Sequence, residues 1–534
     1  MTLLHNPVIR GFAPDPSLVR VGDWYYVATS SFEWFPTIPI HRSRDLAHWE
    51  YAGHVRGAAP GDSLAGVPDS GGIWAPSLSW DGERFWVVYA IVRSVGTPYF
   101  DTDTYVSTAA DVTGRWTAPR RVASHGFDPA LFYHENRLWL LNLQNDHRPG
   151  GRRFAGIVAT ELDRDTLALT GTTHLLLQHE RLVEGPKLVR RGGWYYLLLA
   201  EGGTGYEHGV LVARSRTVTG PYELDDRPLL TSRDDPSLPL QKAGHGELLE
   251  LPDGDWVLSH LAARPVPSPD GPRCTLGRET AVQAVTWDAE GWPRLRQGGW
   301  HPAVEVDMPT SPSPFDQIPY DGGPLGWPWS SPRGYPDPSW ADPTARPGWI
   351  RLRGRHGPES RWAHSLLAQR ITEHRAEAEV TVEARPTTFT QAAGLVLRYD
   401  AQAYLSLDLT WAEHPGETQH GQQWHGGGRT VLRLTERDDN GARQVAVVDA
   451  ASDTPVTLGV TVEGARARFW YLNRGTRTPV GEPLDFGKLS DDHGTRLRFT
   501  GTMAGIHAMD LVDAEFTADF RDFRLVCTPE NPHL

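Results

Sequence analysis

A short sequence phrase recurs five times in the first half of this 534-residue chain, and it limits the possible folds more than any other feature. Each copy starts near a charged or aromatic residue, runs through a few apolar residues and continues into a second, aromatic-rich run. Apolar residues that alternate on both sides of a turn such as Asp81-Gly82 or Gly192-Gly193 are typical of a β-hairpin. The five starting residues, at intervals of 59, 54, 56 and 61 residues, are Asp15, Trp74, Asp128, Glu184 and His245.

The regular interval indicates a repeat architecture, with a period slightly longer than that of the commonest propellers. Five units predict a five-bladed β-propeller over residues 1–308. In a propeller the innermost strand of every blade starts at the same end of the central channel, so the five starting residues should converge on one axis. Three carboxylates, a histidine and an indole would then meet in one funnel.

The composition changes after about residue 308. Residues 309–345 are rich in proline and glycine and suit a connector better than a sheet, because proline fixes the backbone and lacks a donor. From residue 346 to 534 several stretches alternate apolar and polar residues, for example 376–383 and 456–462. Such strands predict an antiparallel β-sandwich of the concanavalin-like type. The whole chain is therefore predicted to be all-β, and no group of catalytic type stands out in its C-terminal part.

Charge and cysteine content narrow the classes of partner. The formal net charge of -14 and the pI near 5.9 argue against a nucleic acid or an anionic membrane, since both need a basic face. Cys274 and Cys527 lie far apart and imply no disulfide framework. The first residues show no basic region followed by an apolar run, so we expect a cytoplasmic protein.

The acidic starting residues need separate weighing. An aspartate before a proline, as at Asp15 and Asp128, is most often a turn former. Glu184 lies at the start of an apolar strand, where a buried charge is costly and is expected to have a partner or a functional role. If the three acids converge, they repel one another, and at least one should keep its proton near neutral pH. A protonated carboxyl that faces an ionised one is the pair of groups that glycoside hydrolysis uses. A solvated or ion-filled channel mouth is the alternative.

Six short blocks carry a recognisable pattern, and they are Gly11–Ser17, Ser31–Pro36, Gly71–Pro76, Phe127–Pro129, Val183–Pro186 and Leu276–Thr280. Together they resemble glycoside hydrolase family 43, and specifically its two-domain β-xylosidases. The resemblance spans essentially the whole chain, although in the sandwich part it is only general. It implies a five-bladed propeller that inverts the anomeric centre and removes xylose from the non-reducing ends of β-1,4-xylooligosaccharides. Some members of the family also cleave α-L-arabinofuranosides.

The resemblance assigns a role to each of the three acids. Asp15 would be the general base that takes a proton from the attacking water, and Glu184 would be the general acid that protonates the leaving oxygen. Asp128 would raise the pKa of Glu184 and hold its side chain in orientation. An inverting enzyme needs its two working carboxyls roughly 6.5 to 9.5 Å apart, so that water and sugar fit between them. Opposing blades across a channel can supply such a gap.

Four further residues would line the sugar site. Arg278 resembles the family's arginine that binds sugar hydroxyls near the base, with a structural ion pair as the alternative. Trp74 and Phe32 resemble the aromatic walls of the xylose subsite, although blade packing is the default for both. His245 matches a channel histidine that in several relatives joins the water shell of a calcium ion. Because calcium prefers oxygen ligands, a structural hydrogen-bonding role for His245 is nearly as well supported. No cofactor is required for the chemistry itself.

In these relatives a loop of the sandwich closes one side of the funnel and leaves a dead-end pocket, which implies exo action. The corresponding stretch here is 499–505, where Met503 stands near the point at which relatives tend to have an aromatic residue. That departure bears on the choice between xylosides and arabinofuranosides. We also expect a homo-oligomer, either a dimer or a tetramer.

Two other classes of function stay open. A sugar-binding propeller without turnover would keep Trp74, Phe32 and Arg278, but it would not need Asp15 and Glu184 together. An α-L-arabinofuranosidase or an endo-arabinanase would use the same three acids. Arabinanases act on a polymer through an open cleft and generally lack the appended sandwich, so the domain content favours exo action on short substrates.

Overall fold

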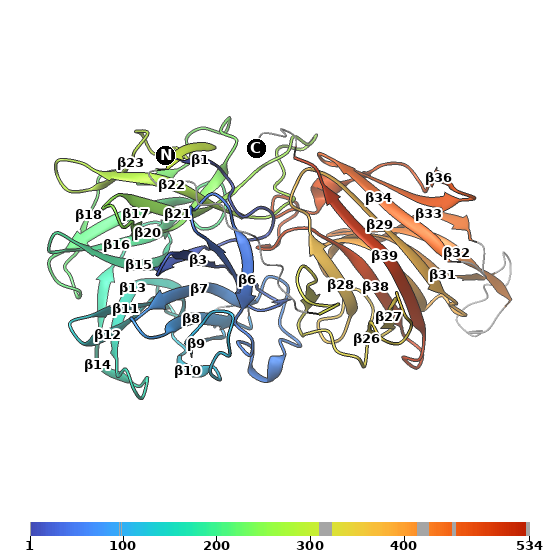
Figure 1. The fold of residues 1–534 in the computed structure, drawn as a ribbon, viewed down its shortest axis with the longest axis horizontal. Coiled ribbons are helices and arrows are strands. Elements are labelled where there is room, and N and C mark those ends of the chain that lie inside the picture. Colours follow the sequence, from blue (N-terminus) through green and yellow to red (C-terminus); the bar gives the residue numbers. More distant parts are fainter. Residues whose placement is uncertain are drawn as a thin grey trace. The chain divides into compact units, whose positions relative to one another are not determined.

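The computed structural model of the chain describes residues 2–94, 97, 99–308, 323–413, 427–450 and 455–529. The chain divides into two compact units: unit 1 is Met1–Pro265 with Arg278–Tyr320, and unit 2 is Val266–Gly277 with Asp321–Leu534. Both units are built from strands (Figure 1), and the described residues contain no α-helix and only two short 3-10 turns, Pro60–Asp62 and Phe486–Lys488. The predicted all-β class is confirmed.

Unit 1 contains five antiparallel sheets that follow one another along the chain, each with its strands in sequence order. Tight turns join their strands: Gly192 and Gly193 have φ values of 56° and 78°, the left-handed backbone that a two-residue type I′ hairpin requires. In the fourth sheet β19 (Leu230–Thr231) also pairs with β17. The strands of the five sheets in order are β2 (Ser17–Val21), β3 (Trp24–Ala28), β5 (Pro39–Ser43) and β6 (Glu50–His54); β7 (Gly72–Trp80), β8 (Phe85–Val92), β9 (Thr102–Ala109) and β10 (Arg120–Ala123); β11 (Gly126–His134), β12 (Arg137–Asn145), β13 (Phe154–Leu162) and β14 (Leu169–Leu177); β15 (Val183–Arg191), β16 (Trp194–Glu201), β17 (Gly209–Ser215) and β18 (Glu223–Leu224); and β20 (Gln241–Glu250), β21 (Trp256–Ala263), β22 (Glu279–Trp287) and β23 (Pro293–Leu295).

The first strand of each sheet contacts the first strand of the next. β2 contacts β7, β7 contacts β11, β11 contacts β15, β15 contacts β20, and β20 contacts β2 again. The ends of unit 1 also meet, because β1 (Thr2–His5) pairs with β24 (Glu305–Met308). The Asn6 side chain adds hydrogen bonds to the carbonyl groups of Val282 and Ala303. These contacts bring the starts of the five first strands into one region.

The first strands share a backbone irregularity near their starts. β7, β11, β15 and β20 each break register with the neighbouring strand at this point, as a β-bulge does. A bulge of this kind re-aims side chains and is common next to active sites. One residue of each sheet has a left-handed backbone here, and these residues are Asp15, Ala75, Asp128, Gly185 and His245.

The bulges correct the sequence-based alignment of the five copies. That alignment matches Trp74 and Glu184 to Asp15, but Ala75 and Gly185 occupy the equivalent position, so Trp74 and Glu184 each lie one residue earlier. The sequence-based alignment chose Trp74 and Glu184 because an indole and a carboxyl are larger and chemically more active than the side chains of Ala75 and Gly185. The position itself is defined by the backbone, which a residue other than glycine adopts at a cost of about 1–3 kcal/mol.

Unit 2 consists of two antiparallel sheets that share one hydrophobic core. Along β29, buried residues alternate with more exposed ones, which is the period-two pattern that the sequence predicts. Val380 comes to the core from one sheet and Leu407 from the other. The strands of the larger sheet in order are β26 (Ala341–Asp342), β27 (Ile350–Arg353), β39 (Thr517–Cys527), β29 (Arg375–Ala384), β34 (Val456–Glu463), β35 (Arg466–Asn473) and β36 (Thr476–Pro479), and β37 (Leu484–Asp485) pairs with β35. Those of the smaller sheet are β28 (Ser365–Arg370), β38 (Met503–Asp510), β30 (Gln391–Asp400), β31 (Ala403–Glu413), β32 (Gly428–Asp438) and β33 (Gly441–Asp449).

One segment of unit 2 comes from between two strands of unit 1. Val266–Gly277 connects β21 to β22, yet Leu276 lies in the core of unit 2, and the Thr275 carbonyl accepts a hydrogen bond of 3.0 Å from the backbone N–H of Thr502. The predicted division into 1–308, 309–345 and 346–534 does not set this segment apart, and its boundaries stay a prediction. Residues 309–322 of the predicted connector lie outside the described residues.

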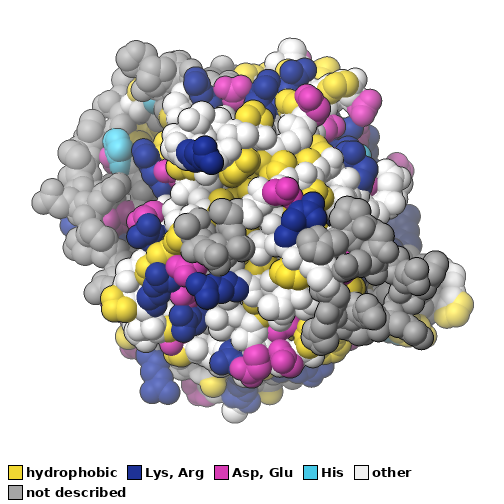
Figure 2. All heavy atoms as spheres, turned by 90° about the vertical axis from the view of Figure 1, so that its right-hand side faces the viewer, with side chains coloured by type: hydrophobic (Ala, Val, Ile, Leu, Met, Phe, Trp, Pro, Cys, Tyr) yellow, Lys and Arg dark blue, Asp and Glu magenta, His cyan; other side chains and the backbone are white. Residues whose placement is uncertain are grey.

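No helix in the described part of the chain combines the length and apolar character needed to cross a bilayer. On the face drawn in Figure 2, basic and acidic side chains are interspersed rather than gathered by sign. The expected absence of nucleic-acid and membrane partners stays a prediction.

A buried ion pair in unit 1 gives a stability prediction. Glu279 is fully buried, and its carboxylate accepts two hydrogen bonds from Arg264, of 2.7 and 2.8 Å, and one from the backbone N–H of Gly11. Removing one partner of a buried pair costs about 3–5 kcal/mol, because the other charge is left uncompensated. Glu279→Gln should therefore lower the free energy of unfolding by about 3 kcal/mol in urea denaturation. Glu305→Gln, at an exposed position, is the matched control and should change it by less than about 0.5 kcal/mol. Equal urea midpoints for Glu279→Gln and Glu305→Gln would contradict the view that the buried pair of Glu279 and Arg264 stabilises unit 1.

Candidate active site

The three predicted catalytic acids lie buried together in unit 1. Asp15 precedes β2, Asp128 lies on β11 and Glu184 lies on β15, and each of the three residues is only 6% or 7% exposed. The backbone N–H of Gly185 donates a hydrogen bond of 3.1 Å to Oδ2 of Asp128, so the starts of β11 and β15 are tied together. The charge of Asp15 raises the pKa of both other acids, which places all three within electrostatic reach of one another.

Asp15 is held in its ionised form. Burial raises its pKa, but Arg278, His245 and a hydrogen bond from Ser30 outweigh burial and leave the pKa below the usual value. Ser30 Oγ donates to Oδ2 at 2.6 Å, and Nη1 of Arg278 lies 3.2 Å from Oδ1. Asp15 is thus a buried carboxylate with its charge balanced on one side by a guanidinium.

Asp128 and Glu184 form a pair that retains a proton. Burial and the charge of Asp15 raise the pKa of Glu184 to about 7. Burial and the charge of Glu184 raise the pKa of Asp128 well above its usual value. Because the two carboxyls repel each other, they share at least one proton near neutral pH. The site therefore contains an ionised carboxylate and a protonated carboxyl at the same time.

His245 lies beside the acids as a neutral imidazole. Burial lowers its pKa to about 4, and its Nδ1 is 3.6 Å from Oδ1 of Asp15. The ring packs tightly on the fourth sheet, since a Cβ added to Gly185 would lie 2.9 Å from Nε2 of His245. Gly185 is also left-handed, with φ of 58°, so only glycine suits this point.

The predicted sugar-binding aromatic residues belong to one cluster. Phe32 and Trp74 have ring centroids 6.2 Å apart, and Trp74 also meets Phe127 at 5.4 Å. Arg278 lies 5.8 Å from the centre of the Phe32 ring, so this cluster borders the side of Asp15 that carries the guanidinium. Nε1 of Trp74 donates to the carbonyl of Ser70 at 2.9 Å, which fixes the indole. The structure thus gathers all seven predicted site residues in unit 1.

Three further residues of the site were not predicted from the sequence. Ser30 is one of them. The sequence feature that could have indicated it is a hydroxyl residue directly before the recognised block Ser31–Pro36. Lys187 is another: it is buried, its Nζ lies 3.5 Å from Oε2 of Glu247, and its charge lowers the pKa of Asp128. A lysine three residues after Glu184 on an apolar strand was a signal of a second buried charge.

The third is His208, which is fully buried and precedes β17. Its Nδ1 lies 3.1 Å from the Glu201 carbonyl, so Nδ1 carries the proton and Nε2 is an acceptor. Nε2 has no hydrogen-bond partner among the described residues. The ring packs on Gly244, where an added Cβ would lie 2.3 Å from Nε2. Burial and the charge of Arg278 lower its pKa to about 3, so it is neutral as well.

The residues around His245 do not by themselves form a calcium site. Calcium takes six to eight oxygen ligands, whereas the carboxylate closest to the imidazole, Asp15, is already bound by Ser30 and Arg278. In the described part of the chain, the one His, Cys, Asp or Glu group with metal-ligand spacing is Cys274, Asp491 and Asp492, which belongs to unit 2. A calcium ion held through water at His245 stays a prediction.

Met503 is the first residue of β38 and is buried in unit 2. The neighbouring Thr500 carbonyl accepts a hydrogen bond of 2.8 Å from the Tyr399 hydroxyl. The stretch 499–505 is therefore anchored to β30 of the smaller sheet. Its predicted role in closing a sugar pocket stays a prediction.

Comparison with known proteins accounts for nearly the whole chain. Residues 4–293 match the family model for glycosyl hydrolases family 43, and residues 318–526 match the model for the β-xylosidase C-terminal concanavalin A-like domain. The chain is 36% identical to xylosidase/arabinosidase 43B of Humicola insolens, with 99% of each chain covered. It is 35% identical to a β-xylosidase of Bacillus subtilis, with 97% of this chain and 98% of the relative covered.

Among solved structures, a xylan β-1,4-xylosidase from Bacillus halodurans C-125 superimposes with a TM-score of 0.91 and is 38% identical, covering 98% of this chain and 99% of its own. These matches confirm the predicted resemblance and identify an enzyme of the glycoside hydrolase class. With buried acids in two protonation states at its centre and relatives aligned along both units, the chain belongs to glycosyl hydrolase family 43.

Proposed function

We propose that this protein is an inverting, exo-acting β-xylosidase that releases xylose from the non-reducing ends of β-1,4-xylooligosaccharides. The observation that carries the proposal is the pair of protonation states in one buried site. Asp15 is kept ionised, while Asp128 and Glu184 retain a proton. Glycoside hydrolysis with inversion needs one carboxylate to take a proton from water and one carboxyl to give a proton to the leaving oxygen.

The five sheets of unit 1 are proposed to be the blades of a five-bladed propeller. The cyclic order of contacts from β2 through β7, β11, β15 and β20 back to β2 supports this arrangement. The left-handed residue that all five sheets share supports it too, since equivalent residues then face the same end of the channel. In this architecture Asp15 and Glu184 come from the first and fourth blades, which leaves space for a sugar ring and a water between them.

In the proposed reaction, Asp15 removes a proton from the water that attacks the anomeric carbon. Glu184 gives its proton to the glycosidic oxygen as the bond to the leaving sugar breaks. Asp128 is proposed to be the ionised member of the pair, held by the hydrogen bond that it accepts from Gly185, so that the shared proton stays on Glu184. Arg278 fixes Asp15, and the sugar is proposed to lie beside this guanidinium and the apolar faces of Phe32 and Trp74.

The names of the relatives support a xyloside as the main substrate. Several full-length relatives are named β-xylosidase, and the match of unit 2 to a β-xylosidase C-terminal domain favours the same substrate. An α-L-arabinofuranosidase is the second candidate, because one relative is a non-reducing end α-L-arabinofuranosidase from Bacteroides ovatus. A sugar-binding propeller without turnover is less well supported, since it does not need acids in opposite protonation states.

Substrate choice is tested by a side-by-side assay. The purified enzyme should cleave nitrophenyl β-xyloside with a kcat/KM at least about tenfold above that for nitrophenyl α-L-arabinofuranoside, which is the discrimination that about 1.4 kcal/mol of differential binding supplies. Proton NMR of the first-formed xylose should show the α-anomer, because attack by water inverts the β-linkage. A first product in the β-configuration would rule out the proposed mechanism, and a reversed substrate ratio would favour the arabinofuranosidase.

Removal of the general acid should depend on the leaving group. Glu184→Ala should slow xylobiose hydrolysis by about 10²–10⁴-fold, since protonation of the leaving oxygen supplies a gain of that size. Dinitrophenyl β-xyloside should be largely spared, because its leaving group needs no proton. The exposed Glu180→Ala is the control and should match the wild type on both substrates. An equal loss on both substrates would count against Glu184 as the acid.

The pH dependence follows from the two pKa directions. Activity should be steady at mildly acidic pH, where Asp15 is ionised, and should fall as the pH rises above about 7, where Glu184 loses its proton. If Asp128 is the ionised member of the pair, as proposed, Asp128→Asn removes its repulsion of the Glu184 carboxylate, and the basic limb of the kcat/KM profile should move to lower pH by about one unit. Asp23→Asn at an exposed turn is the control. A basic limb that stays in place or moves upward would show that Asp128 does not keep Glu184 protonated.

A further inference from the structure

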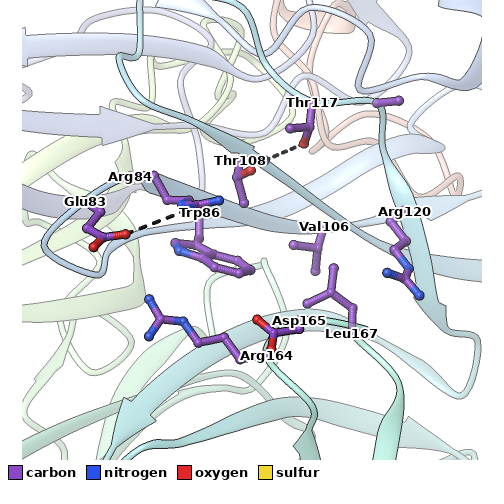
Figure 3. Close-up of a pocket in the computed structure, with 11 residues that line it drawn as sticks. Glu83, Arg84, Trp86, Val106, Thr108, Thr117, Arg120, Arg164, Asp165 and Leu167 are labelled. Atoms are coloured by element: carbon purple, nitrogen blue, oxygen red, sulfur yellow. Dashed lines mark hydrogen bonds and ion pairs between the residues drawn. The ribbon is translucent and has the colours of Figure 1, made fainter.

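A cavity lies in unit 1, at the opposite end of the strands from the acids. It has a volume of about 540 Å³ and lies between the second and third sheets (Figure 3). β7 carries Trp74 near its start and leads, after its end at Trp80, into Glu83 and Arg84 of the cavity wall. Six residues of a strand span about 20 Å. A molecule in this cavity therefore cannot touch Asp15 or Glu184.

The floor of the cavity is apolar and fixed in place. Trp86 lies at the centre of the view, with Val106 and Leu167 to one side of it (Figure 3). Nε1 of Trp86 donates a hydrogen bond of 2.7 Å to Oδ2 of Asp81, and Arg164 donates one of 2.6 Å to the same oxygen. The indole cannot turn without breaking this arrangement. The cavity thus offers a preformed apolar surface, as most small-molecule sites do.

The walls add hydrogen-bonding groups of both kinds. Arg120 is an exposed donor, and its guanidinium has no hydrogen-bond partner among the residues that the structure describes. The Asp165 carboxylate is an acceptor at the rim, and it too has no hydrogen-bond partner among the described residues. Thr117 Oγ1 accepts a hydrogen bond of 2.9 Å from the backbone N–H of Thr108, which fixes the wall that carries both threonines. Figure 3 shows these groups around the apolar floor.

The balance of charge indicates a neutral ligand. Arg84 pairs with Glu83, and Arg164 pairs with Asp81. The remaining Arg120 interacts electrostatically with Asp163, and Asp165 adds a second carboxylate to the lining, so the cavity has no surplus of positive charge for a phosphate or a carboxylate. Separate donors and acceptors around an apolar floor suit a molecule with hydroxyl groups on its edges and C–H groups on its face, which is a sugar.

We propose that this cavity is a second carbohydrate-binding site, which holds a β-1,4-linked segment of two or three xylose units away from the reacting centre. Its volume lies in the usual range for small-molecule sites, about 300–1,000 Å³. The choice of xylose as the sugar rests on the proposed function. The position of the site and its neutral character are independent of that function.

The test uses the full-length Asp15→Ala enzyme, so that bound sugar is not cleaved. Calorimetric titration with xylotriose should show two sites. Ala118→Trp fills the cavity from an exposed position in its lining, and Arg120→Ala removes the free donor, so each should weaken one of the two sites at least about tenfold. Arg115→Ala changes an exposed arginine outside the cavity and should leave both sites intact. A single site in the parent, or two sites that survive both cavity variants, would overturn the proposal.

Two further measurements separate this proposal from the proposed function. In the otherwise native enzyme, Ala118→Trp should leave kcat/KM for nitrophenyl β-xyloside unchanged, and a tenfold loss would mean that the cavity is coupled to the reacting site and is not a separate one. Inorganic phosphate should not displace xylotriose from the second site, and displacement would overturn its neutral character. If the native enzyme cleaves no β-xyloside while Ala118→Trp still removes a xylotriose site, the proposed function fails and the second site stands.

Discussion

Repulsion among buried carboxylates is the constraint on which the rest of this structure depends. Asp15, Asp128 and Glu184 lie in one buried region, and three negative charges cannot all persist there. The surroundings decide which acid ionises: Ser30 and Arg278 bind Asp15, whereas burial leaves Glu184 with a pKa near 7. The same kind of group, a carboxyl, is thus ionised in one place and protonated in another because of its surroundings.

Backbone geometry makes that gathering possible. Asp15, Asp128 and His245 all have a left-handed backbone that these residues rarely adopt, and Asp128 and His245 lie at β-bulges near the starts of their strands. The same geometry needs glycine at Gly185, because the His245 ring occupies the space of a side chain. Backbone strain and close packing are therefore concentrated at the candidate active site.

Much of the fold and the site could be predicted because the signals were local. Each copy of the repeat carries its own turn and its own apolar alternation, and each acid lies inside a short motif. The position of the bulge was missed at Ala75 and Gly185, since a left-handed backbone leaves no side-chain signature at an alanine. Lys187 and His208 were missed because their roles come from contacts with residues far along the chain. No local pattern in Val266–Gly277 shows that its apolar residues enter the core of unit 2.

That last segment limits how freely the two halves of this enzyme can be exchanged during evolution. A single peptide bond separates Gly277, whose backbone packs against Thr500, from Arg278, which pairs with Asp15. Loss of the C-terminal half would leave Leu276 without its hydrophobic surroundings, two residues before the arginine that pairs with Asp15. Unit 2 is built from two separate stretches of the chain, so recombination at a single junction cannot exchange the whole of it. The two units are therefore inherited together, or both stretches must be exchanged at once.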